Sequence, residues 1–116
     1  MADSDCLFCK MARGEITPDV VYQDDAVLAF RDINPQAPVH VVLIPKRHVI
    51  SVNELQPEHD GLIGRLVRAA AEVARKEGIA ERGYRLLTNC GPDGGQVVMH
   101  LHFHVVGGRR MTWPPG

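Results

Sequence analysis

Three histidines alternate with apolar residues towards the end of the chain: His100, His102 and His104. Successive side chains of a β-strand point to opposite faces, so this spacing places all three imidazoles on one side of a sheet. The apolar residues that alternate with them would face a core: Leu101, Phe103 and Val105. Imidazole titrates near neutral pH and serves as nucleophile, base or metal ligand. The pattern therefore predicts a reactive strand face.

One metal ion held by all three histidines is disfavoured by strand geometry. The Cα atoms of His100 and His104 would lie roughly 13 Å apart, while neighbouring histidines would lie roughly 7 Å apart. Zinc–nitrogen bonds of about 2.0–2.1 Å require the ring nitrogens to converge, which only a neighbouring pair or a bent strand would allow. A hydrated polar face without chemistry is a further alternative.

Nucleophilic catalysis at phosphorus is the chemistry that we favour for this strand. A neutral imidazole would attack, a covalent phosphohistidine would form, and water would then release it. His102 has an imidazole on each side and is the expected nucleophile. His40 is the only polar residue of an apolar strand and is expected nearby.

The remaining sequence predicts an α+β fold in one domain over residues 1–116: a five-stranded antiparallel sheet, one long helix and a short N-terminal helix. The short helix is expected over residues 5–13, with Ser4 or Asp5 as N-cap and Gly14 at its end. The strands are expected as an antiparallel meander over Val20–Gln23, Ala26–Arg31, Val39–Ile44, Tyr84–Thr88 and Gln96–Val106.

The long helix is predicted to open at Pro57 and to end at Gly78. Apolar residues recur in it at helical spacing, and His59 near its start is expected to be exposed. The predicted buried stripe consists of Leu62, Ile63, Leu66, Val67, Ala70, Val73 and Ala74.

The composition is that of an ordinary globular protein: 116 residues, 45% hydrophobic and 23% charged, with a net charge of -1. This charge gives no indication of nucleic-acid or membrane binding. No apolar run is long enough to cross a bilayer, and the acidic start of the chain lacks the apolar stretch of a signal peptide. We therefore expect a cytoplasmic protein with reduced thiols or a metal site.

Cys6 and Cys9 have the C-x-x-C spacing, which places both thiols on one face of the first helix. This spacing is half of a zinc site, or two buried thiols without a ligand. The glycine-rich turn at residues 90–95 lacks the G-x-x-x-x-G-K-[ST] pattern, which excludes a P-loop nucleotidase.

The sequence His-Leu-His-Phe-His-Val-Val resembles the H-φ-H-φ-H-φ-φ signature of the histidine triad (HIT) nucleotide-binding family. Residues 30–46 are similar to that family's nucleoside-binding segment. Further segments resemble its Hint branch: Asn89, residues 94–96, residues 107–109 and the Trp-Pro-Pro-Gly ending at residues 113–116. The resemblance covers nearly the whole chain.

The resemblance implies a HIT fold and a homodimer whose two sheets join into ten strands. It also implies hydrolysis of purine nucleoside 5′-phosphoramidates to a nucleoside monophosphate and an amine. In that scheme His102 is the nucleophile that carries the nucleotidyl group, and three other histidines orient it and share protons: His40, His100 and His104.

The resemblance also implies a nucleotide site. Asn89 and the backbone of the turn formed by Gly95, Gln96 and Val97 would hold phosphate, and Asp32 would accept hydrogen bonds from the ribose. The purine would be lined by Leu7, Phe8, Met11, Phe30, Ile33 and Val42, for which ordinary core packing is the alternative.

Val97 departs from the family pattern, because better-known Hint enzymes have a serine there. Valine donates no hydrogen bond, so a contact near the scissile phosphate is missing. One such contact is worth about 2–4 kcal/mol where it acts on transition-state charge. Slower turnover or an altered leaving-group preference is therefore expected.

Several bacterial-type family members, which this chain resembles, combine the two cysteines with two histidines. That resemblance implies a structural zinc ion held by Cys6, Cys9, His48 and His100. His100 would then be a ligand and would not move protons. Two other functions stay open: a dinucleoside polyphosphate hydrolase of a sister branch, and a nucleotide-binding or zinc-dependent regulatory adaptor.

Overall fold

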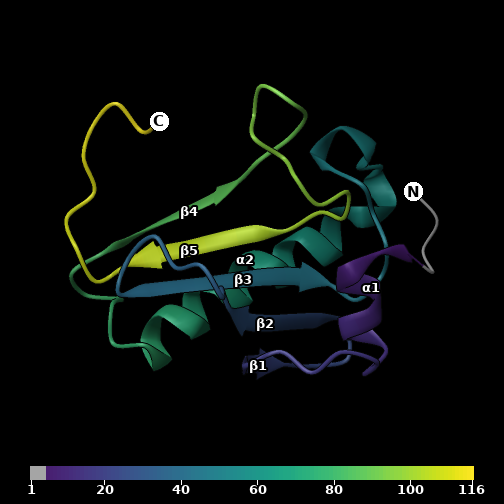
Figure 1. The fold of residues 1–116 in the computed structure, drawn as a ribbon, viewed down its shortest axis with the longest axis horizontal. Coiled ribbons are helices and arrows are strands. Elements are labelled where there is room, and N and C mark those ends of the chain that lie inside the picture. Colours follow the sequence, from purple (N-terminus) through teal and green to yellow (C-terminus); the bar gives the residue numbers. More distant parts are fainter. Residues whose placement is uncertain (1–4) are drawn as a thin grey trace.

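A single antiparallel sheet organises the protein, with the strand order β1-β2-β3-β5-β4 (Figure 1). The computed structural model describes residues 5–116. Its strands are β1 Val20–Gln23, β2 Val27–Arg31, β3 Val39–Pro45, β4 Tyr84–Thr88 and β5 Phe103–Gly107. Its helical elements are α1 Leu7–Ala12, α2 Asp60–Lys76 and the short 3-10 turns η2 Val52–Glu54 and η3 Pro57–His59. The predicted α+β architecture is confirmed.

The predicted hairpin around Asp24 forms between β1 and β2. The Asp24 carboxylate accepts hydrogen bonds from the backbone N–H groups of Ala26 and Val27, each at 2.8 Å. It also accepts one from the Tyr22 hydroxyl at 2.7 Å. An aspartate that satisfies backbone donors in this way fixes the turn and with it the register of the two strands.

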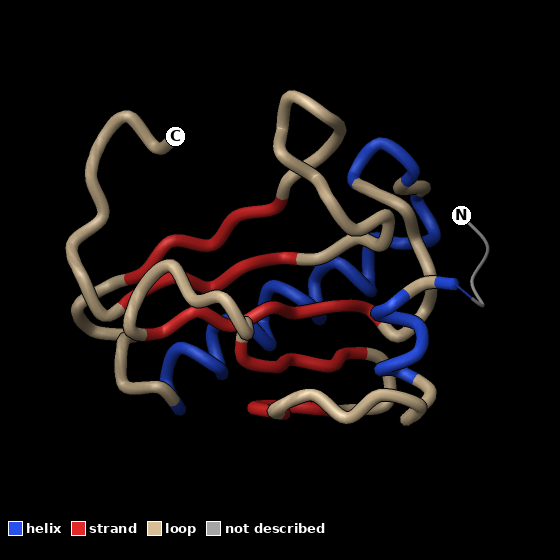
Figure 2. The backbone as a smooth tube through the Cα atoms, viewed as in Figure 1, coloured by secondary structure: helices blue, strands red, loops and turns tan. Residues whose placement is uncertain are grey.

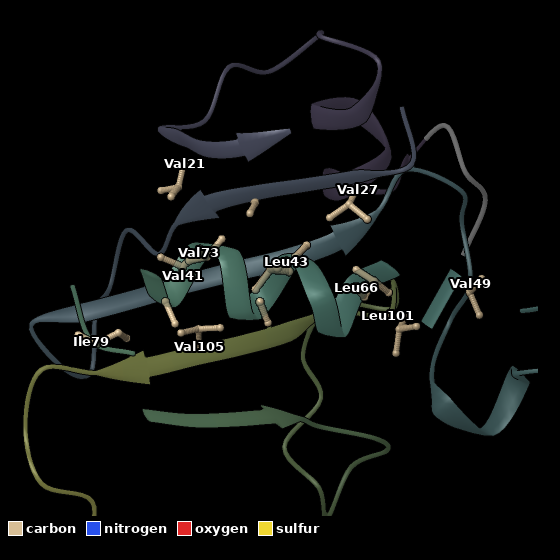
Figure 3. Close-up of a cluster of buried hydrophobic side chains, with 14 residues drawn as sticks. Val21, Val27, Val41, Leu43, Val49, Leu66, Val73, Ile79, Leu101 and Val105 are labelled. Carbon is tan, nitrogen blue, oxygen red and sulfur yellow. The ribbon is translucent and has the colours of Figure 1, made fainter. Parts of the chain in front are cut away.

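The two faces of the sheet are both apolar but carry different partners. Val41 and Leu43 of β3 pack against α2 in the larger core, which Figure 3 shows between the sheet and the helix. Val42 and Ile44 alternate with them and face the other side, where they join a smaller cluster with Phe8 of α1. This alternation explains why every residue of β3 after Val39 is buried.

The long helix follows the predicted stripe with three differences. Pro57 begins a 3-10 turn, and α2 starts at Asp60. Val67 was expected to be buried but is 43% exposed, because it lies at one edge of the apolar stripe, and Ala69 at the opposite edge is buried instead. His59 was expected to be exposed but is buried, and its Nδ1 accepts a hydrogen bond from the Gln56 backbone N–H at 2.8 Å. A histidine that caps the helix start in this way is held out of solvent.

The last strand differs from its prediction in length and in position. β5 begins at Phe103 rather than at Gln96, and the preceding residues form a turn and a bend (Figure 2). The predicted meander holds only for β1 to β3. The chain then crosses along α2 to β4, and β5 inserts between β3 and β4.

Pro45 explains why β5 starts late. The register pairs Leu43 with Phe103, so a longer strand would place Leu101 opposite Pro45, which has no N–H to donate. The Pro45 carbonyl instead accepts a hydrogen bond from the His100 side chain at 2.8 Å. On the other side, the Thr88 hydroxyl donates to the His102 carbonyl at 2.7 Å. Before Phe103, hydrogen bonds made by side chains therefore take the place of backbone hydrogen bonds between the strands.

The first helix is also shorter than predicted. Its N-cap is Cys6, whose Sγ accepts a hydrogen bond from the Cys9 backbone N–H at 3.3 Å, so Asp5 is not the cap. Ser4, the other predicted cap, lies outside the described residues. Within residues 5–116, no helix is long and apolar enough to cross a membrane.

Candidate functional site

His102 lies just before β5 with a fixed ring orientation. Its Nδ1 is 2.7 Å from the backbone carbonyl oxygen of His100, and the side chain is buried. A carbonyl only accepts, so Nδ1 carries the proton of the neutral ring. Nε2 of His102 therefore keeps its lone pair, which is the protonation state that a nucleophilic histidine needs.

His40 and His104 form a second hydrogen-bonded unit on the same face of the sheet. The Gln36 backbone N–H donates to His40 Nδ1 at 3.1 Å, so the proton of neutral His40 sits on Nε2. That Nε2 lies 2.8 Å from His104 Nδ1, which accepts the bond. The order of donors leaves Nε2–H of His104 as the free end of the pair. The rings of His102 and His104 are 5.1 Å apart.

The pKa of His104 falls from its ordinary value of 6.5 to about 4. Burial is the main cause, because it disfavours the charged ring. Repulsion from His102 and His40 adds to the effect, and the Asp32 carboxylate opposes it. His104 is therefore neutral at pH 7 and keeps the donor order described above.

Asp32 lies beside this pair. One carboxylate oxygen is 3.4 Å from His40 Nε2, and the other accepts a hydrogen bond from the Asn34 backbone N–H at 2.8 Å. The side chain is half-buried, so it stays open to a ligand. The structure thus brings Asp32, predicted as a ribose acceptor, next to two of the predicted histidines.

A cleft of about 290 Å³ opens beside His40 and His104. Asn89, which was predicted to hold phosphate, lines it. Several lining residues were not predicted: Gln36, Arg85, Leu87, Val106, Arg109, Met111 and Pro115. Arg109 belongs to the Gly-Gly-Arg segment that the family resemblance had marked without giving it a role. Gln36 acts through its backbone, which no side-chain pattern reveals.

The residues predicted to line the purine divide into two groups. Phe8, Phe30 and Val42 are buried together, and Met11 packs against them. The rings of Phe8 and Phe30 meet edge to face at 5.6 Å. Leu7 and Ile33 do not join this cluster, because both side chains are exposed. The buried members therefore form a packed apolar cluster on this face of the sheet.

The loop between β4 and β5 positions the predicted phosphate turn. Gly95 has a φ of 82°, a conformation that suits glycine. The Gln96 side chain points inwards, accepting a hydrogen bond from the Gly91 N–H and donating to the carbonyls of Ile50 and Val98. Gln96 therefore holds the loop through its side chain. Its backbone N–H donates to the Gly91 carbonyl, and that of Gly95 to the Pro92 carbonyl, each at 3.0 Å, so these two predicted phosphate donors are already used within the loop. Val97 is 86% exposed.

Cys6, Cys9, His48 and His100 converge in a second site, which we call the Cys2His2 cluster. The two Nδ1 atoms of His48 and His100 are 3.2 Å apart. Sγ of Cys6 is 3.2 Å from His100 Nδ1, and Sγ of Cys9 is 3.2 Å from His48 Nδ1 and 3.5 Å from His100 Nδ1. Ligand atoms around a tetrahedral zinc ion lie about 3.3–3.8 Å apart. The donor set and its spacing fit zinc.

His100 shows the usual support of a metal-ligating histidine. Its Nδ1 faces the Cys2His2 cluster, and its Nε2–H donates to the Pro45 carbonyl at 2.8 Å. The ring is fully buried, and of the two roles expected for His100, catalysis and metal ligation, its position in the cluster supports the second. The alternation itself holds from Leu101 to Val105, whose apolar members all join the α2 core.

The comparisons with known proteins agree with this geometry. Residues 13–111 match the model of the HIT domain family. The chain is 52% identical to a purine nucleoside phosphoramidase of Escherichia coli K12 over 103 residues, 89% of this chain and 87% of that protein. It is 48% identical over 117 residues to adenylylsulfatase HINT1 of Arabidopsis thaliana, 99% of this chain and 79% of that protein.

Solved structures give the same result. A HIT family hydrolase from Legionella pneumophila Philadelphia 1 has a TM-score of 0.95 at 49% identity, covering 97% of this chain and all of that one. A histidine triad protein from Clostridium difficile has a TM-score of 0.92 at 40% identity, with 97% of each chain covered. The chain belongs to the HIT domain family, and its relatives place it in the Hint branch.

Proposed function

We propose that this HIT-family hydrolase cleaves the P–N bond of purine nucleoside 5′-phosphoramidates. The observation that carries the proposal is the 2.7 Å contact between His102 Nδ1 and the His100 carbonyl, which leaves Nε2 of His102 ready to attack. The 52% identity to a purine nucleoside phosphoramidase supports the substrate class.

The reaction has two displacement steps at one phosphorus atom. His102 Nε2 attacks, an N–P bond to the histidine forms, the P–N bond to the amine breaks, and the leaving nitrogen takes up one proton. Water then attacks the same phosphorus, the bond to His102 breaks, one proton is released, and the nucleoside monophosphate leaves. His104 presents its Nε2–H to this centre, and His40 keeps it in that tautomer, since His40 Nε2–H donates to His104 Nδ1.

The nucleotide in this proposal lies across the face of the sheet that carries His40, His102 and His104, which we call the site face. Asp32 accepts hydrogen bonds from the ribose, and Asn89 with the backbone N–H of Val97 holds the phosphate, since the N–H groups of Gly95 and Gln96 donate within the loop. The base packs on the cluster of Phe8, Phe30, Val42 and Met11, and it covers the exposed Ile33. Half-buried carboxylate and amide groups beside an apolar wall support this arrangement.

The test is incubation with adenosine 5′-phosphoramidate and, separately, with diadenosine tetraphosphate. We expect the wild-type protein to release AMP from the phosphoramidate and the His102→Ala variant to release none. Preferential cleavage of the tetraphosphate would instead indicate the sister-branch hydrolase. No cleavage, with AMP binding retained, would indicate a regulatory adaptor.

Adenosine 5′-phosphosulfate is a second candidate substrate. The relative from Arabidopsis thaliana named adenylylsulfatase is 48% identical over 99% of this chain. The same attack by His102 would release sulfate in place of an amine. Comparing kcat/KM for the phosphosulfate and the phosphoramidate decides which leaving group the enzyme prefers.

We further propose that the Cys2His2 cluster holds a structural zinc ion. Four protein ligands close its coordination sphere, so zinc would stabilise the fold locally and leave no position for substrate. Elemental analysis of protein purified without added metal should give about one zinc per chain. A zinc content near zero would contradict this proposal.

The homodimer and the cytoplasmic location complete the proposal. In the described residues β4 pairs with β5 alone, so its other edge is available to a second copy and two sheets can join into ten strands. Light scattering should give twice the chain mass. Cysteines arranged as metal ligands rather than as a disulfide support a reducing compartment.

A further inference from the structure

His100 belongs to two structures at once. Its imidazole lies in the Cys2His2 cluster, with Nδ1 3.2 Å from Sγ of Cys6. Its backbone carbonyl, in the same residue, accepts the hydrogen bond that orients His102 at 2.7 Å. A movement of the His100 side chain that rotates the backbone at this residue therefore also moves the carbonyl oxygen that binds His102 Nδ1.

The backbone at His100 is not held by a strand. Residues 98–100 form a bend, and β5 begins only at Phe103. Two contacts fix the bend: the His100 Nε2–H bond to the Pro45 carbonyl at 2.8 Å, and the Leu101 N–H bond to the Val49 carbonyl at 2.6 Å. Val49 follows His48, which is another member of the cluster. The cluster thus connects the bend itself, through His100, to the segment from Pro45 to Val49 that holds it, through His48.

Phe8 provides a second connection between the cluster and His102. It lies between Cys6 and Cys9 in α1, and its ring is 5.2 Å from the His102 ring and 5.8 Å from the His100 ring. α1 has only six residues, a length at which a helix is unstable without tertiary contacts. Anchoring both cysteines holds the helix, and the helix holds Phe8 against the edge of His102.

We infer that the Cys2His2 cluster is a positioning device for His102, acting through the His100 carbonyl and through the Phe8 ring. The inference rests on the proposed function for its catalytic consequence. A bound cation would hold all four donor atoms together, whereas without it the thiols offer only weak S–H hydrogen bonds to the rings, so metal occupancy keeps the bend and α1 in place. Loss of the metal should leave the sheet folded while His102 loses its single orientation.

The test compares variants at the edge of the cluster with a cysteine outside it. Cys9→Ala and His48→Ala remove ligands, and Cys90→Ala is the matched control in the loop after β4. We measure kcat and, at one fixed pH, the 15N signals of the His102 imidazole, which report the nitrogen that carries the proton. Thermal unfolding and zinc content are measured on the same samples.

We expect the control to match the wild type, with His102 protonated at Nδ1 only. The two ligand variants should lose zinc, show a mixture of His102 tautomers, and lose kcat about 10–100-fold, the size of effect that loss of an orienting hydrogen bond has at metal sites. Chelated wild-type protein should show the same changes, and zinc should restore it but not the variants. Folded, zinc-free variants with unchanged His102 signals and kcat within twofold would overturn the inference.

Two further outcomes are separable. If the zinc-free forms unfold, cadmium-loaded and zinc-loaded wild type are compared, since the longer cadmium bonds displace His100. Shifted His102 signals then support the coupling, and identical signals with equal kcat overturn it. If the zinc-loaded wild type hydrolyses no phosphoramidate, the proposed function fails, while the response of the His102 signals to zinc still decides the coupling.

Discussion

The two faces of the sheet are built in different ways. The α2 face is filled by aliphatic side chains such as Leu43, Leu66 and Val73, whose contacts depend on volume and not on direction. The opposite face holds His40, His102 and His104, and each ring has a nitrogen assigned by one particular partner. Stability should therefore respond mainly to changes on the first face, and activity to changes on the second.

The largest effect should come from His102→Ala, the direct test of the site face. The nucleophile is lost, so kcat should fall about 1,000-fold or more. Removing a buried ring that makes one hydrogen bond should cost less stability than a core substitution. Steady-state assays and urea unfolding of the same preparation measure both. A variant that kept a tenth of the wild-type kcat would remove His102 from the role of nucleophile.

Leu66→Ala is the converse experiment on the helix face. Leu66 is almost fully buried between α2 and the sheet, so its truncation should lower the free energy of unfolding by about 2–5 kcal/mol. The kcat of the folded fraction should stay within twofold. Val67→Ala is the matched control, because its side chain is 43% exposed and should change stability by less than about 0.5 kcal/mol.

Val97→Ser tests the rim of the site face. A hydroxyl at this exposed position can donate a hydrogen bond that valine cannot, so kcat should rise. Competition from water limits the gain to about 1.4 kcal/mol, which is about tenfold. Val97→Ala adds no donor and serves as the control. Equal kcat values for the serine and alanine variants would show that no substrate group meets residue 97.

The smallest effect concerns the pH dependence of stability. The pKa of His104 is lowered to about 4 in the folded protein, so the unfolded chain binds more protons between pH 4 and 6.5. The contribution of His104 to the free energy of unfolding is fully present above pH 6.5 and is lost as the pH falls towards 4. Because the ring is partly solvated, we expect only about 1 kcal/mol.

Urea unfolding of wild type and His104→Gln at pH 7.5 and pH 5 isolates this contribution. Glutamine cannot titrate, so the loss of stability on acidification should be smaller in the variant by that amount. An equal loss in both proteins would place the titrating group elsewhere.

Patterns within one segment of the sequence predicted those features of the fold that depend on residues close together in the chain. The hairpin at Asp24, the stripe along α2 and the alternation from Leu101 to Val105 all follow from spacing alone, and the structure confirms them. The HIT fold and the convergence of Cys6 and Cys9 with His48 and His100 followed from the family resemblance.

The remaining features depend on partners that are distant in the chain. β5 starts at Phe103 because Pro45 cannot donate, and Val67 is exposed because the helix turns the opposite edge of its stripe, which carries Ala69, towards the sheet. Gln36 contributes only a backbone N–H to His40, and because any residue except proline has this group, the residue type does not predict the contact. These details required the register of the sheet, which spacing within one segment does not determine.

The insertion of β5 between β3 and β4 has a consequence for biosynthesis. The strand that precedes the C-terminal tail is also a central one, with β3 on one side and β4 on the other. Until the ribosome has released residues 103–107, β3 has an open edge and β4 has no neighbour in the sheet. His104 therefore meets His40 only after residues 103–107 have emerged, and a shorter nascent chain contains no assembled His40–His104 pair.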